Sequence, residues 1–163
     1  MNRPPPPTRQ QIVTRILTEA IDGLPQDLFS LRGNADEGDI LRENGGGDYF
    51  AAAWDAEGVV VFGYDHYASP SDPLLRPPPP ARLQPLVEAA TSRCPNGATC
   101  GFWIHGDVVS QLPRGRALEP LQILFGPAGT ANLPPAIAKL VASGASEEEV
   151  RAALEAIGAK PIR

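Results

Sequence analysis

The stretch from Asp48 to Tyr67 constrains the fold of this chain more than any other. Two runs rich in aromatic and β-branched residues, Tyr49–Trp54 and Val59–Tyr64, flank a short polar segment that ends in Gly58. This pattern predicts a β-hairpin in which Gly58 adopts a positive φ. Because the second run is apolar at consecutive positions, we expect a central strand that is covered on both faces.

Helical periodicity and further strand patterns place other elements around this hairpin. A helix is predicted to begin at a capping box formed by Thr8 and Gln11. A second helix has Pro85 in its first turn, and Thr99–His105 predicts a strand whose alternate side chains face opposite sides. Ile40-Leu41 is predicted to form a short strand or a turn, and Leu121–Phe125 is a further strand candidate.

The C-terminal part has the pattern of two short helices, which are joined near Gly144 and of which the second is capped by Ser146. We therefore predict an α+β fold: a mainly antiparallel sheet of four to five strands, helices on one face, and a C-terminal helical hairpin. The predicted organisation is a flexible proline arm at 1–7, an α+β domain at 8–130, and the hairpin at 131–160, packed on the domain or appended to it.

The composition limits the classes of function. With 163 residues, of which 42% are hydrophobic, the chain is long enough for one domain with a sizeable core. The net charge is −5 and no basic stripe is present, so we expect no nucleic-acid binding. No apolar run of signal-peptide or membrane-spanning length is present, which predicts a cytoplasmic protein without membrane association.

The two cysteines do not have the spacing of a zinc half-site. Cys94 and Cys100 are expected to be free thiols in a reducing compartment, although an oxidising compartment would allow them to close a small loop. We expect no cofactor.

The two histidines each end a predicted strand beside an acid, as Asp65-His66 and as His105-Gly106-Asp107. If the two strands are parallel neighbours, the motifs meet and could bind a divalent metal or serve as an acid–base pair. If the strands are antiparallel, the motifs lie at opposite ends and no composite site exists. A structural hydrogen bond at each strand end is the alternative to a catalytic role.

Negative charge is concentrated between Leu31 and Glu57, where two arginines stand against seven acidic residues. Tyr and Trp side chains beside an acidic surface are typical of protein–protein interfaces. We therefore predict a surface that binds a basic protein partner, with a solvated loop that only increases solubility as the alternative. The predicted contact residues are Asp36, Glu37, Asp39, Asp48, Tyr49, Trp54 and Tyr67.

The segments Gly45–Phe50 and Gly58–His66 resemble a group of small bacterial proteins in which a glycine-rich loop leads into a hairpin. The second strand of that hairpin ends in Gly-Phe-Asp-His and continues as Glu-Ser, where this chain has Tyr64 for Phe and Tyr67-Ala68 for Glu-Ser. Ala98–Trp103 is also similar to a Thr-Phe-x-x-Trp strand of that group. Small acidic α+β proteins of this kind look like immunity proteins of bacterial toxin systems, so the resemblance implies an inhibitor that binds a toxin.

Three hypotheses follow from the sequence. The first is a non-enzymatic binding protein, an immunity- or antitoxin-like inhibitor of a basic partner such as a toxin. The second is a metal-dependent or acid–base enzyme that uses Asp65, His66, His105 and Asp107. The third is a structural component that self-associates through its proline arms and helical tail.

Overall fold

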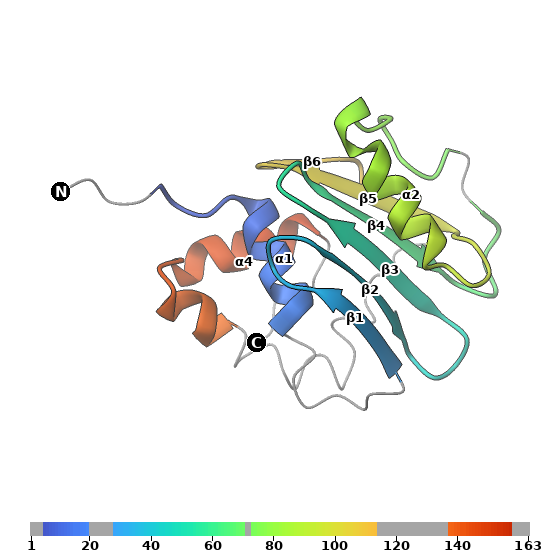
Figure 1. The fold of residues 1–163 in the computed structure, drawn as a ribbon, viewed down its shortest axis with the longest axis horizontal. Coiled ribbons are helices and arrows are strands. Elements are labelled where there is room, and N and C mark those ends of the chain that lie inside the picture. Colours follow the sequence, from blue (N-terminus) through green and yellow to red (C-terminus); the bar gives the residue numbers. More distant parts are fainter. Residues whose placement is uncertain (1–4, 20–27, 71–72, 114–136, 158–163) are drawn as a thin grey trace.

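The computed structural model describes residues 5–19, 28–70, 73–113 and 137–157. Within these residues, six strands form one antiparallel sheet in which every strand lies beside its neighbour in the sequence (Figure 1). The strands are β1 (Phe29–Gly33), β2 (Gly38–Glu43), β3 (Tyr49–Trp54), β4 (Val59–Tyr64), β5 (Cys100–His105) and β6 (Val108–Val109). The α+β class and the antiparallel sheet are confirmed, whereas four to five strands is too low a number.

The predicted hairpin of β3 and β4 forms the middle of the sheet. Tyr49 pairs with Tyr64 and Trp54 with Val59, and every residue of the two strands except Tyr64 is buried. β4 lies between β3 and β5. The expectation of a central strand covered on both faces is therefore confirmed.

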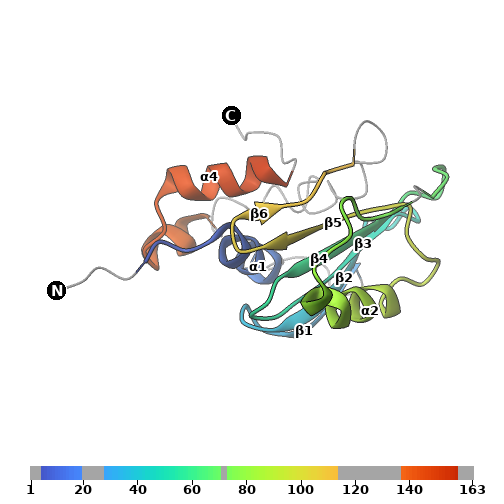
Figure 2. The ribbon, with the colours of Figure 1, turned by 90° about the horizontal axis from the view of Figure 1, so that it is seen from above.

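Helices cover both faces of the sheet, and not one face as the sequence predicted (Figures 1 and 2). The helices α1 (Arg9–Glu19) and α4 (Glu147–Ala156) pack with Val59 and Val61 on the first face, which we call the α1 face. The 3₁₀ turn η2 (Ala81–Leu83) and α2 (Gln84–Ser92) pack with Val60 and Phe62 on the opposite, α2 face. Alternate side chains of β4 thus make two apolar faces, and each face needs its own cover.

The predicted helix signals are present. Thr8 N–H donates to Gln11 Oε1 at 2.9 Å, and Gln11 N–H donates to Thr8 Oγ1 at 3.2 Å, which confirms the capping box of α1. Pro85 lies in the first turn of α2, and Ser146 closes a capping box at the start of α4.

The C-terminal part roughly matches the predicted hairpin. Residues 137–142 are helical, and a turn that includes Gly144, at a φ of 114°, leads to α4. The strand candidate Leu121–Phe125 lies outside the described residues. The limits of the arm, the domain and the hairpin stay predictions.

Gly58 does not have the positive φ that the hairpin pattern predicted. Its lack of a side chain is required for a different reason, which is close packing across the sheet and onto the α2 face. A Cβ atom at Gly58 would lie 2.5 Å from the Ile104 carbonyl oxygen and 2.6 Å from Leu83 Cδ2. The glycine therefore lets β5 and η2 approach the turn between β3 and β4.

The two thiols belong to opposite sides of the sheet. Cys100 belongs to the α1-face core, whereas Cys94 packs against the α2-face core, and both are free. Burial raises the pKa of Cys94 to about 11 and that of Cys100 to about 12. Neither thiol is therefore a thiolate nucleophile near neutral pH.

Among the described residues, no helix is both long enough and apolar enough to cross a membrane.

Candidate functional site

The two histidine motifs lie at opposite ends of the sheet, because β4 and β5 are antiparallel neighbours. His66 is the second residue after the end of β4, and His105 is the last residue of β5. The composite site that a parallel arrangement would have formed from His66, His105, Asp65 and Asp107 is therefore ruled out.

His105 and Asp107 hold turns together at their own end. His105 Nδ1 lies 2.7 Å from the Glu57 carbonyl oxygen, and Asp107 Oδ1 accepts the backbone N–H of Arg9 at 2.9 Å. These contacts join β5 to the turn after β3 and to the start of α1. Structural contacts of this kind are what the sequence offered as the alternative to catalysis.

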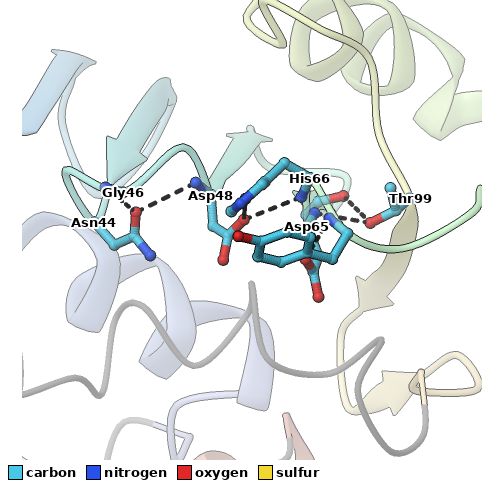
Figure 3. A network of polar contacts seen from close by, with 8 residues as sticks. Asn44, Gly46, Asp48, Asp65, His66 and Thr99 are labelled. Atoms are coloured by element: carbon cyan, nitrogen blue, oxygen red, sulfur yellow. Dashed lines mark hydrogen bonds and ion pairs between the residues drawn. The ribbon is translucent and has the colours of Figure 1, made fainter.

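His66 lies beside two carboxylates, one from each of two neighbouring loops (Figure 3). Asp48 directly precedes β3, and Asp65 directly follows β4. His66 Nδ1 lies 2.7 Å from Asp48 Oδ1, and His66 N–H donates to the same oxygen at 3.1 Å. One potential ligand atom from each of the three residues lies within 4.8 Å of the others. We call Asp48, Asp65 and His66 the Asp-His cluster.

The glycine-rich loop before β3 is held by one side chain. Asn44 Oδ1 accepts the N–H groups of Gly46 at 2.7 Å and Asp48 at 3.2 Å (Figure 3). Gly47 has a φ of 103°, and a Cβ atom there would lie 3.4 Å from His66 Nδ1. The absent side chain at Gly47 thus leaves room for the imidazole ring beside the loop.

The turn after β4 is also fixed by hydrogen bonds. Asp65 has no exposed surface, its N–H donates to Thr99 Oγ1 at 3.1 Å, and its Oδ1 accepts the N–H of Tyr67 at 2.9 Å. The ring centroids of His66 and Tyr67 are 3.8 Å apart, and the Tyr67 side chain is largely exposed. The cluster therefore has one buried carboxylate and one imidazole at the surface.

An imidazole with two carboxylates is a donor set for divalent metal ions, and the His66–Asp48 pair could also transfer a proton. The sequence pointed to Asp65 and His66 but assigned Asp48 to a different surface. The pairing register of the hairpin is the feature that could have linked Asp48 to Asp65. Because Tyr49 pairs with Tyr64, the residue before the first strand lies opposite the residue after the second.

The other end of the sheet carries three turns with acidic side chains, since alternate turns of a sheet in sequence order share one end. The turns connect β1 to β2, β3 to β4 and β5 to β6. Their acidic residues, which we call the acidic end, are Asp36, Glu37, Asp55, Glu57 and Asp107.

Gln10 of α1 joins two of these turns. Its Nε2 donates to the carbonyl oxygens of Asp55 at 3.0 Å and Ala56 at 3.2 Å, and its Oε1 accepts the N–H of Gly106 at 2.8 Å. Gln10 is 8% exposed, and its three side-chain hydrogen bonds are partly buried. Sequence reasoning missed this residue, because nothing in the sequence distinguishes it from the adjacent Gln11.

The four predicted acidic contact residues do not form one surface, since Asp48 belongs to the Asp-His cluster at the opposite end of the sheet. Asp36 and Glu37 are exposed. Asp39 is half-buried and has ion pairs with Arg32 at 2.9 Å and Arg93 at 3.0 Å. Burial, followed by the charge of Arg32, lowers the pKa of Arg93, while Asp39 opposes this shift. Asp39 therefore offers little negative charge to a partner.

The expectation that Tyr49 and Trp54 are exposed is wrong, because only 2% and 1% of their surfaces are accessible. Trp54 Nε1 donates to the Asn34 carbonyl oxygen at 2.7 Å, which anchors the turn between β1 and β2. The expectation that Tyr67 is exposed is confirmed, at 75%. Trp54 thus anchors one of the three turns of the acidic end from within the core.

Tyr49 lies at the end of the sheet that carries the Asp-His cluster. Its hydroxyl donates to the Gly97 carbonyl oxygen and accepts the N–H of Asn96 at 3.0 Å. Its ring stacks on Tyr64 with centroids 4.9 Å apart. Burial raises the pKa of Tyr49 to about 12. The predicted contact set is thus divided between both ends of the sheet and the core.

The structure defines an α+β protein with an antiparallel sheet in sequence order and a polar cluster at each end of that sheet. The chain matches no protein-family model, and comparisons with curated proteins and with solved structures give no significant match.

Proposed function

We propose that this protein is a non-enzymatic binding protein of the immunity or antitoxin kind, which engages a basic protein partner through the acidic end. The observation that carries the proposal is that Asp36, Glu37, Glu57 and Asp107 are all exposed on turns at one end of one sheet. Since neighbouring strands are about 4.8 Å apart, the three turns extend over about 20 Å. The assignment to immunity-type inhibitors rests on the sequence resemblance, whereas the acidic surface supports binding to a basic partner.

The charge balance of this end favours a basic partner. Among the described residues, Arg9 and Arg82 accompany the five carboxylates of the acidic end, in addition to the arginines that form ion pairs with Asp39. Arg82 Nη1 lies 4.0 Å from Glu57 Oε2, and both side chains are more than half exposed, so this pair neutralises little. A surface with excess negative charge increases the association rate of a basic partner and selects against acidic ones.

The acidic end is also held in place before a partner binds. Asn34 Oδ1 accepts the N–H groups of Asp36 at 2.9 Å and Glu37 at 3.3 Å, and Asp55 Oδ1 accepts the N–H of Glu57 at 2.8 Å. Gln10 connects the second and third turns. A surface that is already ordered loses less conformational entropy on binding.

The proposal is tested by placing a photo-crosslinking amino acid at Glu37 in cells of the source organism. The captured protein is then identified and titrated against the purified chain. We expect a basic partner, and we expect the Asp36→Lys/Glu37→Lys variant to weaken its binding at least tenfold, mainly through a lower association rate that depends on salt.

The matched control is Glu88→Lys/Glu155→Lys, which changes the net charge equally at exposed positions on α2 and α4. This variant should keep the affinity of the wild type, and both variants should keep its melting temperature. Wild-type affinity of the Asp36→Lys/Glu37→Lys variant, or an acidic protein as the captured partner, would contradict the proposal.

A further inference from the structure

The Asp-His cluster lies at the end of the sheet opposite the acidic end, so the proposed partner surface does not account for it. We propose that Asp48, Asp65 and His66 bind a divalent transition-metal ion. The inference is independent of the proposed function, because it uses different residues at a different end of the sheet.

The donor set fits ions such as Zn²⁺, Co²⁺, Ni²⁺ and Mn²⁺. An imidazole nitrogen and carboxylate oxygens are ligands for all four, and a set without thiolates does not restrict the site to zinc. Among the described residues, no other group of three His, Cys, Asp or Glu side chains has its ligand atoms this close together. The Asp-His cluster is therefore distinguished, within the described part of the chain, by the close approach of three metal-ligating side chains.

The distances fit a shared ion after a small movement. Two ligands that are each about 2.1 Å from one ion are about 3 to 4 Å apart. In the cluster, His66 Nδ1 is 2.7 Å from Asp48 Oδ1, and no pair of the chosen ligand atoms is further apart than 4.8 Å. Small rotations of the Asp48 and His66 side chains are sufficient, because 19% and 35% of these side chains are accessible, whereas Asp65 is buried and keeps its position.

The loops hold the backbone of the two aspartates in place. Asn44 fixes the Asp48 backbone, and Thr99 fixes that of Asp65, so neither loop has to fold on binding. The missing side chain of Gly47 leaves space beside the imidazole. Three protein donors with a surface-exposed histidine leave further coordination positions for water or for a ligand from solution.

The test is calorimetric titration of the full, untagged and metal-stripped chain with Zn²⁺, Ni²⁺ and Mn²⁺. We expect one ion per chain with a dissociation constant in the micromolar range or below for at least one of the metals. His66→Ala and Asp48→Asn should each weaken that affinity at least tenfold. Asp48→Asn keeps an oxygen that can accept the N–H of His66, so it removes the charge with little change to the fold.

The matched control is His105→Ala, which removes the other histidine from the end of the adjacent strand. It should bind the metal as the wild type does. The absorption spectrum of bound Co²⁺ gives a second readout, which should be lost in His66→Ala and kept in His105→Ala. Absence of binding at millimolar ion, or equal losses in His66→Ala and His105→Ala, would overturn the proposal.

Discussion

Gln10 and Gly106 form two hydrogen bonds with each other: Gly106 N–H donates to Gln10 Oε1 at 2.8 Å, and Gln10 N–H donates to the Gly106 carbonyl oxygen at 3.0 Å. The same glutamine side chain donates to the turn between β3 and β4. One residue of α1 therefore connects the helix to two turns of the acidic end.

Replacing Gln10 with alanine should destabilise the protein by about 1 to 3 kcal/mol, because the partners of its buried amide lose their hydrogen bonds. Chemical denaturation measures this change. The exposed Gln84 at the start of α2 supplies the control, since Gln84→Ala should change the free energy of unfolding by less than about 0.5 kcal/mol. Equal stability of the two variants would mean that the Gln10 contacts contribute nothing.

Replacing Gly58 with alanine should destabilise the protein by about 2 kcal/mol, because the added Cβ would meet backbone and side-chain atoms at 2.5 and 2.6 Å. Thermal unfolding of this variant is compared with that of Gly46→Ala. Gly46 is exposed, and its nearest contact to an added Cβ is 3.4 Å, so this control should unfold almost as the wild type does. A wild-type melting temperature of Gly58→Ala would contradict the close packing.

Tyr49 should titrate at a higher pH than an ordinary tyrosine, because burial raises its pKa from 10.0 to about 12. In a spectrophotometric titration of the folded chain, one of the three tyrosines should ionise near pH 12 and be missing from Tyr49→Phe. The folded state holds this proton more tightly than the unfolded state. The stabilisation of the folded state by the protonated Tyr49 phenol is therefore complete below pH 10 and is lost as the pH rises towards 12. The wild type should consequently lose more stability than Tyr49→Phe over this interval.

Replacing Arg42 with methionine should stabilise the protein by at least about 1 kcal/mol, because it removes a buried charge. Arg42 is 3% exposed, its Nη1 has no hydrogen-bond partner among the described residues, and burial lowers its pKa to about 10. Denaturant unfolding checks the prediction. Arg151→Met, at an exposed ion pair of α4, should have an effect below about 0.5 kcal/mol. A less stable Arg42→Met would show that the guanidinium is favourable where it lies.

Some features could be predicted from the sequence because their causes are local. The capping boxes at Thr8 and Ser146 need only residues within one helical turn. The hairpin of β3 and β4 follows from two apolar runs and a short turn. Gly58 shows the limit of such reasoning. The need for a glycine was visible, but its cause lies in Ile104 and Leu83, which are distant in the sequence.

The candidate site was predictable only in part for the same reason. Asp65-His66 is one motif in the sequence, but its partner Asp48 comes from the other strand of the hairpin. Exposure was harder to predict, because a tryptophan beside a loop can contact solvent or anchor that loop from within. Trp54 does the second, through its bond to the Asn34 carbonyl oxygen.

The sequence by itself determined the α+β class, the central hairpin, the helix caps and the excess of negative charge, since composition and short-range periodicity specify these. Only the tertiary structure decided that α2 lies on the opposite face from α1, that His66 and His105 are separated, and that three acidic turns share one end. These relationships depend on strand order and direction. Both are set by how apolar faces far apart in the chain are buried together, and no single segment specifies them.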